Sequence, residues 1–140
     1  MPVSIQCPAD FPVAIDEVTA LWQRTQEVRK HGDDVVSVRC VTEEEIQKLN
    51  KTYRVKDAPT NVLTFSYDGE HDVALCIDVA QREADAQNIS ARDYFALLLT
   101  HAFLHVTGMD HERSAEEEIT TQQMEQDILS SCGFSKISLQ

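Results

Sequence analysis

The sequence predicts an α+β fold in which a small mixed β-sheet is covered by helices. Strand-like patterns gather in the first half of the chain, whereas most of the second half has helical periodicity. The length of 140 residues and the hydrophobic fraction of 42% fit one domain over residues 1–140 with a single core. The most apolar helical segment is expected at the centre of that core, where it carries candidate metal ligands.

Two strand patterns and two helix patterns alternate in the first half of the chain. In chain order the predicted ranges are a strand at 2–7, a helix at 12–30, a strand at 35–41 and a helix at 42–51. Gly32 is expected to end the first helix, because glycine adopts the left-handed conformation without steric cost. Thr42 and Glu45 form a capping box that begins the second helix. A basic loop that ends at Pro59 is expected to follow.

A hairpin and three helices are predicted for the second half. The hairpin strands cover 62–67 and 72–77 around the turn signal Asp68-Gly69. The helices are expected at 79–87, 90–106 and from 114 to about 132. Apolar residues cover most of the circumference of helix 90–106, which predicts a buried central helix. Gly108 is expected to end it.

Charge argues against a general nucleic-acid-binding protein and against DNA as a partner. The net charge is −12, whereas proteins that bind nucleic acid normally present a basic face. Residues 46–58 are the exception, because four basic residues stand there against Asp57, a local charge of +3. These residues are Lys48, Lys51, Arg54 and Lys56. The segment could contact a phosphate backbone, and a solvated helix end is the alternative interpretation.

Neither a membrane span nor a secretion signal is expected. A span needs roughly 18 consecutive apolar residues, and the N-terminus lacks a basic stretch followed by an apolar one. The sequence therefore predicts a cytoplasmic protein with no membrane partner. Its cysteines include no C-x-x-C pair, so four free thiols are expected in a reducing compartment. They are Cys7, Cys40, Cys76 and Cys132.

Three histidines are spaced as metal ligands. His101 and His105 are four residues apart on a predicted helix, so both lie on one face and can reach one ion. Gly108 can turn the chain back, which allows His111 to approach the same ion. Three imidazoles leave one position of a tetrahedral ion open, as in catalytic zinc sites, although nickel or another transition metal also suits imidazole. Asp110, Glu112 or a backbone carbonyl could hold the outer N–H of a ligand histidine.

The same histidine spacing occurs in metzincin peptidases, and the central helix is accordingly expected to be zincin-like. In those enzymes a glutamate follows the first histidine and acts as the general base. Here that position is Ala102, which disfavours a peptidase.

Two longer stretches resemble the YbeY family of bacterial metal-dependent endoribonucleases. Residues 101–111, HAFLHVTGMDH, resemble the family's histidine motif, and residues 50–66, NKTYRVKDAPTNVLTFS, resemble its second motif. Residues 72–80, DVALCIDVA, give a weaker third match. Ala102 and His71 depart from the family, which has glycine at both positions.

The resemblance implies a single-strand-specific endoribonuclease that acts in ribosomal RNA maturation and ribosome quality control. It implies zinc, or a related ion, on His101, His105 and His111, and it places the family's functional arginine at Arg54. The implied partners are ribosomal RNA and ribosome or assembly proteins.

Chemistry suggests how these residues would act together. The planar guanidinium of Arg54 suits phosphate, and Lys51 and Lys56 would add contacts to the RNA backbone. The sequence shows no general acid or base. A non-catalytic ribosome assembly factor remains an alternative, as does the disfavoured peptidase.

Overall fold

A four-stranded mixed sheet forms the framework of the protein. The computed structural model describes residues 3–30, 32, 34–108 and 115–135. The strands are β1 (Val3–Gln6), β2 (Val35–Val41), β3 (Val62–Tyr67) and β4 (Glu70–Cys76). They are arranged in the order β1-β2-β4-β3, with β1, β2 and β4 parallel and β3 antiparallel at one edge. The predicted α+β class with a small mixed sheet is confirmed.

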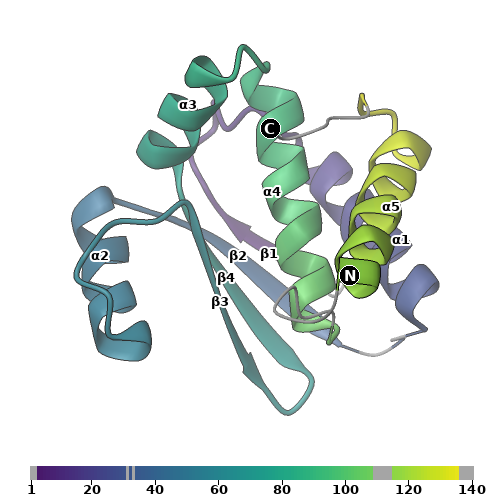
Figure 1. The fold of residues 1–140 in the computed structure, drawn as a ribbon, viewed down its shortest axis with the longest axis horizontal. Helices are drawn as coiled ribbons and strands as arrows, with labels where there is room; N and C mark the ends of the chain where they lie inside the picture. Colours follow the sequence, from purple (N-terminus) through teal and green to yellow (C-terminus); the bar gives the residue numbers. More distant parts are fainter. Residues whose placement is uncertain (1–2, 31, 33, 109–114, 136–140) are drawn as a thin grey trace.

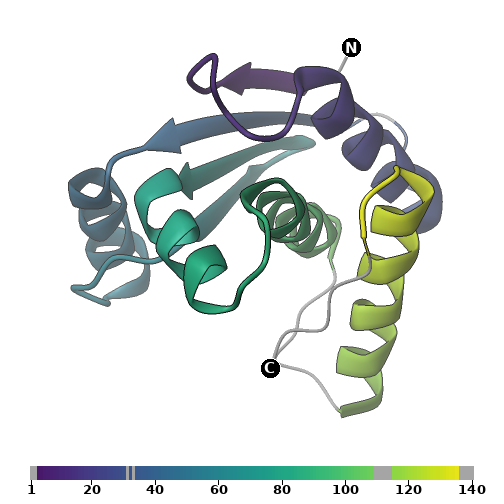
Figure 2. The same cartoon turned by 90° about the horizontal axis from the view of Figure 1, so that it is seen from above.

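Five helices surround this sheet within the described residues. They are α1 (Ile15–Arg29), α2 (Glu43–Arg54), α3 (Ile77–Ala86), α4 (Ala91–Val106) and α5 (Ala115–Ser131). Helices α1, α4 and α5 gather on one side of the sheet, and α2 lies apart from them at the other (Figure 1, Figure 2). The order of helices and strands along the chain is the one that the sequence predicts.

Helix α4 is the centre of the main core. It contacts α1, α3, α5 and β3, and ten of its sixteen residues are buried. Trp22 of α1 packs edge-on against Phe103 of α4, with ring centroids 5.2 Å apart, and both side chains are fully buried. Ser90 caps the helix by accepting a hydrogen bond from the backbone N–H of Asp93 at 3.2 Å. The predicted central, buried helix is confirmed.

A smaller core lies beneath α2 on the opposite face of the sheet. Side chains alternate between the two faces of a strand, so β3 and β4 contribute one set of residues to each core. Ile46 of α2 is fully buried there against Leu63 of β3 and Ala74 of β4. Among the described elements, α2 packs on this face through its contacts with β3 and β4.

Two helix ends differ from the sequence prediction. Lys30 takes the left-handed conformation after α1, with φ 58°, in place of the expected Gly32. Helix α2 runs to Arg54 before Val55 turns left-handed with φ 58°, so Arg54 lies on its last turn and not in the predicted loop. In both cases the left-handed residue donates its backbone N–H to a carbonyl of the last helical turn, and this hydrogen bond ends the helix.

The expectation of four free thiols is wrong for two of the cysteines. Cys7 and Cys40 form a disulfide, with their Cα atoms 5.0 Å apart. The parallel register of β1 and β2 pairs Gln6 with Arg39, which brings the next residue of each strand together. Cys76 and Cys132 are free. Residues 33 positions apart become neighbours only through strand pairing.

Candidate metal centre and catalytic pocket

Two of the three predicted metal ligands lie one turn apart on α4. Four residues of an α-helix advance about 6 Å, so His101 and His105 project from the same face. Both side chains are half-buried, and both line one cavity. Ala102 is buried in the wall of that cavity. The other faces of α4 are anchored in the core, and this packing directs the histidine face toward the opening.

A carboxylate from another helix holds His101. Nδ1 of His101 lies 2.5 Å from Oε1 of Glu125 on α5, and the Glu125 side chain is only 9% exposed. An ionised carboxylate only accepts hydrogen bonds, so Nδ1 carries the hydrogen and Nε2 presents its lone pair. Histidines that bind metal almost always donate their outer N–H in this way. The contact therefore prepares His101 for a metal ion at Nε2.

Glu125 was missed in the sequence, although a signal was present. It belongs to the buried stripe of α5, together with Thr121, Ile128 and Leu129. A glutamate in such a stripe is rarely buried without a partner. The predicted outer partners Asp110 and Glu112 lie outside the described residues.

The contact between His101 and Glu125 can be tested through metal affinity. Glu125→Gln removes the charge that orients the imidazole, and such changes typically lower metal affinity by about 10- to 100-fold. Competition with a chromogenic zinc chelator measures the effect. Glu116→Gln changes an exposed glutamate of the same helix and is the matched control. Equal zinc affinity of the two variants would contradict a positioning role for Glu125.

A cavity of about 350 Å³ joins the histidines to the basic end of α2. Arg54, the last residue of α2, lines it together with His101 and His105. These residues come from segments about fifty positions apart in the sequence. The structure thus brings a guanidinium and two imidazoles to one opening.

The two lysines predicted to bind phosphate lie outside the described lining of this cavity. Lys51 and Lys56 are exposed and are not among the described residues that line the cavity. Nζ of Lys51 lies 3.8 Å from Oδ2 of Asp57. Any contact of these lysines with a ligand would therefore be at the surface and not inside the cavity.

Asn50 fixes the turn that follows Arg54. It is only 4% exposed, and its Nδ2 donates to the carbonyl of Ala58 at 2.9 Å. The backbone carbonyl of Asn50 accepts the backbone N–H of Lys56 at 3.2 Å. One buried residue thereby holds the turn through both its side chain and its backbone, and this fixes the end of α2 at which Arg54 lies.

A network around Glu83 braces the wall of the cavity. Oε1 of Glu83 accepts hydrogen bonds from Asn61 Nδ2 and from the Tyr94 hydroxyl, each at 2.9 Å. Burial and the contact with Glu83 raise the pKa of Tyr94 to about 12. Tyr94 therefore remains protonated at neutral pH and serves as a donor, not as a base.

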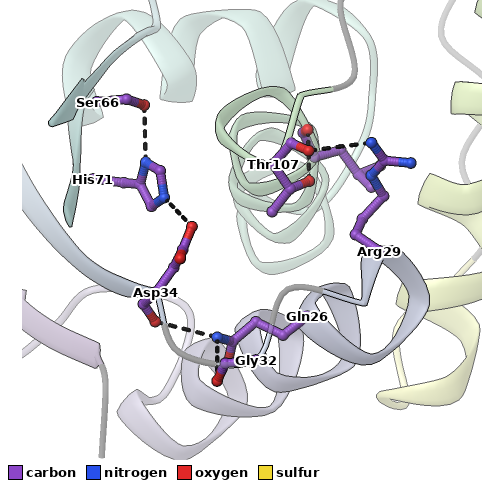
Figure 3. Close-up of polar contacts among 8 residues, drawn as sticks. Gln26, Arg29, Gly32, Asp34, Ser66, His71 and Thr107 are labelled. Atoms are coloured by element: carbon purple, nitrogen blue, oxygen red, sulfur yellow. Dashed lines mark hydrogen bonds and ion pairs between the residues drawn. The ribbon is translucent and has the colours of Figure 1, made fainter. Parts of the chain in front are cut away.

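The chain leaves α4 through a turn that α1 anchors. Nη2 of Arg29 donates to the carbonyl of Thr107 at 3.1 Å (Figure 3), and a cation at this end of a helix complements its dipole. Gly108 follows with φ +100°, as the sequence predicts. A side chain there would be strained, because only glycine adopts this conformation freely.

The third predicted ligand, His111, lies outside the described residues and stays a prediction. Within the described parts of the chain no three His, Cys, Asp or Glu side chains form a metal-binding group. The two imidazoles, together with the carboxylate behind His101, nevertheless have the chemistry of a site for a divalent transition metal.

His71 has a structural position and does not belong to the described lining of the histidine cavity. Its side chain is 6% exposed, with Nδ1 2.8 Å from Ser66 Oγ and Nε2 2.7 Å from Asp34 Oδ2 (Figure 3). The ring also packs edge-on against Trp22. Both nitrogens are engaged, so this departure from the family pattern serves the packing of the hairpin. His31, the fifth histidine, lies outside the described residues.

None of the described helices is both long enough and apolar enough to cross a bilayer.

Known proteins resemble this chain over most of its length. It is 44% identical to the endoribonuclease YbeY of Paracidovorax citrulli over 107 residues, an alignment that covers 74% of this chain and 70% of the relative. It is also 44% identical to the protein of that name from Burkholderia lata over 135 residues, covering 85% and 78%. The solution structure of TM1509 from Thermotoga maritima shares the fold, with a TM-score of 0.61, 25% identity and coverage of 92% and 90%.

The sequence model of one family, described as endoribonuclease YbeY, matches residues 6–133. The match includes both longer motifs and every strand and helix from α1 to α5. The chain therefore belongs to the YbeY family of endoribonucleases.

Proposed function

We propose that this protein is a cytoplasmic, metal-dependent endoribonuclease that cuts single-stranded RNA in the maturation and quality control of small-subunit ribosomal RNA. The observation that carries the proposal is the cavity shared by Arg54, His101 and His105. A cationic group beside the predicted metal ligands suits a substrate that has both a phosphate and a scissile bond. Ribosomal RNA and ribosome or assembly proteins are the partners in this proposal.

The ion would be held by His101, His105 and His111, with zinc as the first candidate and nickel or another transition metal as alternatives. When bound, such an ion polarises a phosphoryl oxygen and activates water at neutral pH. Glu125 keeps the ring of His101 oriented through Nδ1. Because the ring is already oriented, His101 needs little rearrangement when the ion binds.

Arg54 would bind the phosphate group. Its planar guanidinium can donate two parallel hydrogen bonds to two phosphoryl oxygens. In a half-enclosed cavity it would stabilise the charge that builds up on the phosphate in the transition state. Lys51 and Lys56 would contact neighbouring phosphates at the surface and position the strand.

The described lining of the cavity does not favour a peptidase. The position of the peptidase base is occupied by Ala102, which is buried and carries no titratable group. Glu125, the acidic residue that lines the cavity in the described structure, is engaged with His101.

Metal removal tests the function directly. Elemental analysis of the purified protein is expected to find about one transition-metal ion per chain, in line with a three-histidine site. Cleavage of a single-stranded RNA is expected to stop on chelation and to return when zinc is added. Casein in the same preparation should remain intact. RNA cleavage that persists without metal would contradict the proposal, and ribosome association without any cleavage would instead support an assembly factor.

A further inference from the structure

A second cavity of about 330 Å³ lies on the opposite face of the sheet. Strands β3 and β4 form part of its floor, and α2, which packs on this face, contributes Leu49 and Tyr53 to its lining. It is separate from the histidine cavity, because no residue of the described lining belongs to both. Its volume is at the lower end of the range found for small-molecule sites.

Aromatic rings form one side of this cavity. Tyr53 from α2 and Phe65 from β3 meet edge-to-face with ring centroids 5.1 Å apart. Tyr67, two residues further along β3, lies on the same face of the strand. Tyr53 and Tyr67 are 63% and 59% exposed. Large rings left open to solvent on a sheet surface are suited to stacking on a planar ligand.

The floor beside the rings is polar and carries one charge of each sign. Arg39 of β2 and Asp72 of β4 both line it, together with Gln6 of β1. Arg39 is also 3.7 Å from Glu45 of α2, so it is partly neutralised. Such a lining offers donors and acceptors without a strong net charge. This chemistry suits the edge of a neutral base better than a phosphate.

The two cavities share no described lining residue, but neighbouring residues of the same two elements line them. On edge strand β3, Thr64 lines the histidine cavity and Phe65 lines the aromatic one. On the last turn of α2, Arg54 lines the first and Tyr53 the second. In the described sheet β3 is an edge strand that pairs only with β4, so both cavities adjoin the edge of the sheet.

We propose that the aromatic cavity binds a nucleobase of single-stranded RNA whose phosphate backbone also contacts Arg54. The inference rests on the proposed action on RNA and adds a base-stacking site at Tyr53, Phe65 and Tyr67. Ring faces stack on any base, so the site provides affinity for unpaired RNA with little sequence preference. It also explains how a chain of charge −12 can hold RNA with few cationic contacts. A paired base cannot occupy the cavity without leaving its stack.

The test measures binding and not cleavage. Fluorescence anisotropy compares a labelled 2′-O-methyl adenosine 12-mer with an abasic 12-mer that has the same phosphates, and a gel after each titration checks that the oligonucleotides are intact. The metal-loaded protein is expected to bind the adenosine oligonucleotide roughly 5- to 100-fold more tightly than the abasic one. Tyr67→Ala should lose most of that preference, and Tyr67→Phe should keep it because the ring remains.

Ile119→Ala is the matched control, since Ile119 is an apolar residue of α5 that is 55% exposed. It should bind as the wild type does. Equal affinity of the wild-type protein for both oligonucleotides, including no detectable binding, would overturn the inference, as would full base preference in Tyr67→Ala. If the aromatic cavity instead bound a protein partner, the wild-type protein would show equal affinity for the two oligonucleotides. Chelator-sensitive RNA cleavage that survives either result would leave the proposed function standing, so the two failures are distinguishable.

Discussion

His105→Ala is expected to remove the bound metal and to lower RNA cleavage by about three orders of magnitude or more. The ion is asked to supply several kcal/mol of transition-state stabilisation, and each 1.36 kcal/mol is a factor of ten in rate. His105 is half-buried and lines the same cavity as His101. Its loss leaves too few imidazoles for a catalytic site. Elemental analysis and a cleavage assay on the same sample measure both effects.

Glu125→Gln is a milder change to the metal site than His105→Ala, and the two variants should differ in their response to added zinc. Glu125→Gln keeps all the ligands, so an excess of zinc should restore its activity, whereas His105→Ala should remain inactive at any zinc concentration. A His105→Ala protein that lost its metal yet cleaved RNA at the wild-type rate would show that the mechanism is wrong.

Arg54→Ala is expected to lower kcat for RNA cleavage by roughly 100- to 1000-fold, the usual effect of removing one group that stabilises transition-state charge. Metal content should not change, because Arg54 lies on α2 and the histidine pair on α4. Arg54→Glu should be at least as inactive, since it places a negative charge beside the phosphate. Steady-state kinetics with metal analysis of each variant separate the two effects.

Two further substitutions show whether charge or shape matters at this position. Arg54→Lys keeps the charge but loses the planar fork, so it should recover only part of the activity. Lys51→Ala, one turn earlier on α2, should raise KM with little change in kcat, because Lys51 is exposed outside the cavity. Equal losses in Lys51→Ala and Arg54→Ala would point to a general electrostatic role for the basic end of α2.

Local sequence patterns predicted the strands and helices well. The ranges for β2 and β3 are those of the structure, and the caps at Thr42 and Ser90 form the expected hydrogen bonds at 3.1 and 3.2 Å. These features depend on residues within a few positions of each other. The end of α2 was less predictable, because a β-branched residue such as Val55 rarely adopts the left-handed conformation. There the buried Asn50 holds the turn in place.

Contacts between distant segments were less accessible to sequence reasoning. The disulfide of Cys7 and Cys40 follows from the register of β1 and β2, which residue spacing does not reveal. The engagement of His71 with Asp34 and Ser66 depends on the same sheet together with the loop before β2. The aromatic cavity appears only when α2 packs beside β3.

The sequence by itself determined the class of fold, the central helix and the pair His101 and His105, because helical periodicity places residues four apart on one face. It also determined the position of Gly108, where a positive φ is needed. Only the tertiary structure decided that Glu125 holds His101 and that Arg54 lines the same cavity as the histidines. Those contacts depend on how α2 and α5 pack around α4, and packing is a property of the whole core.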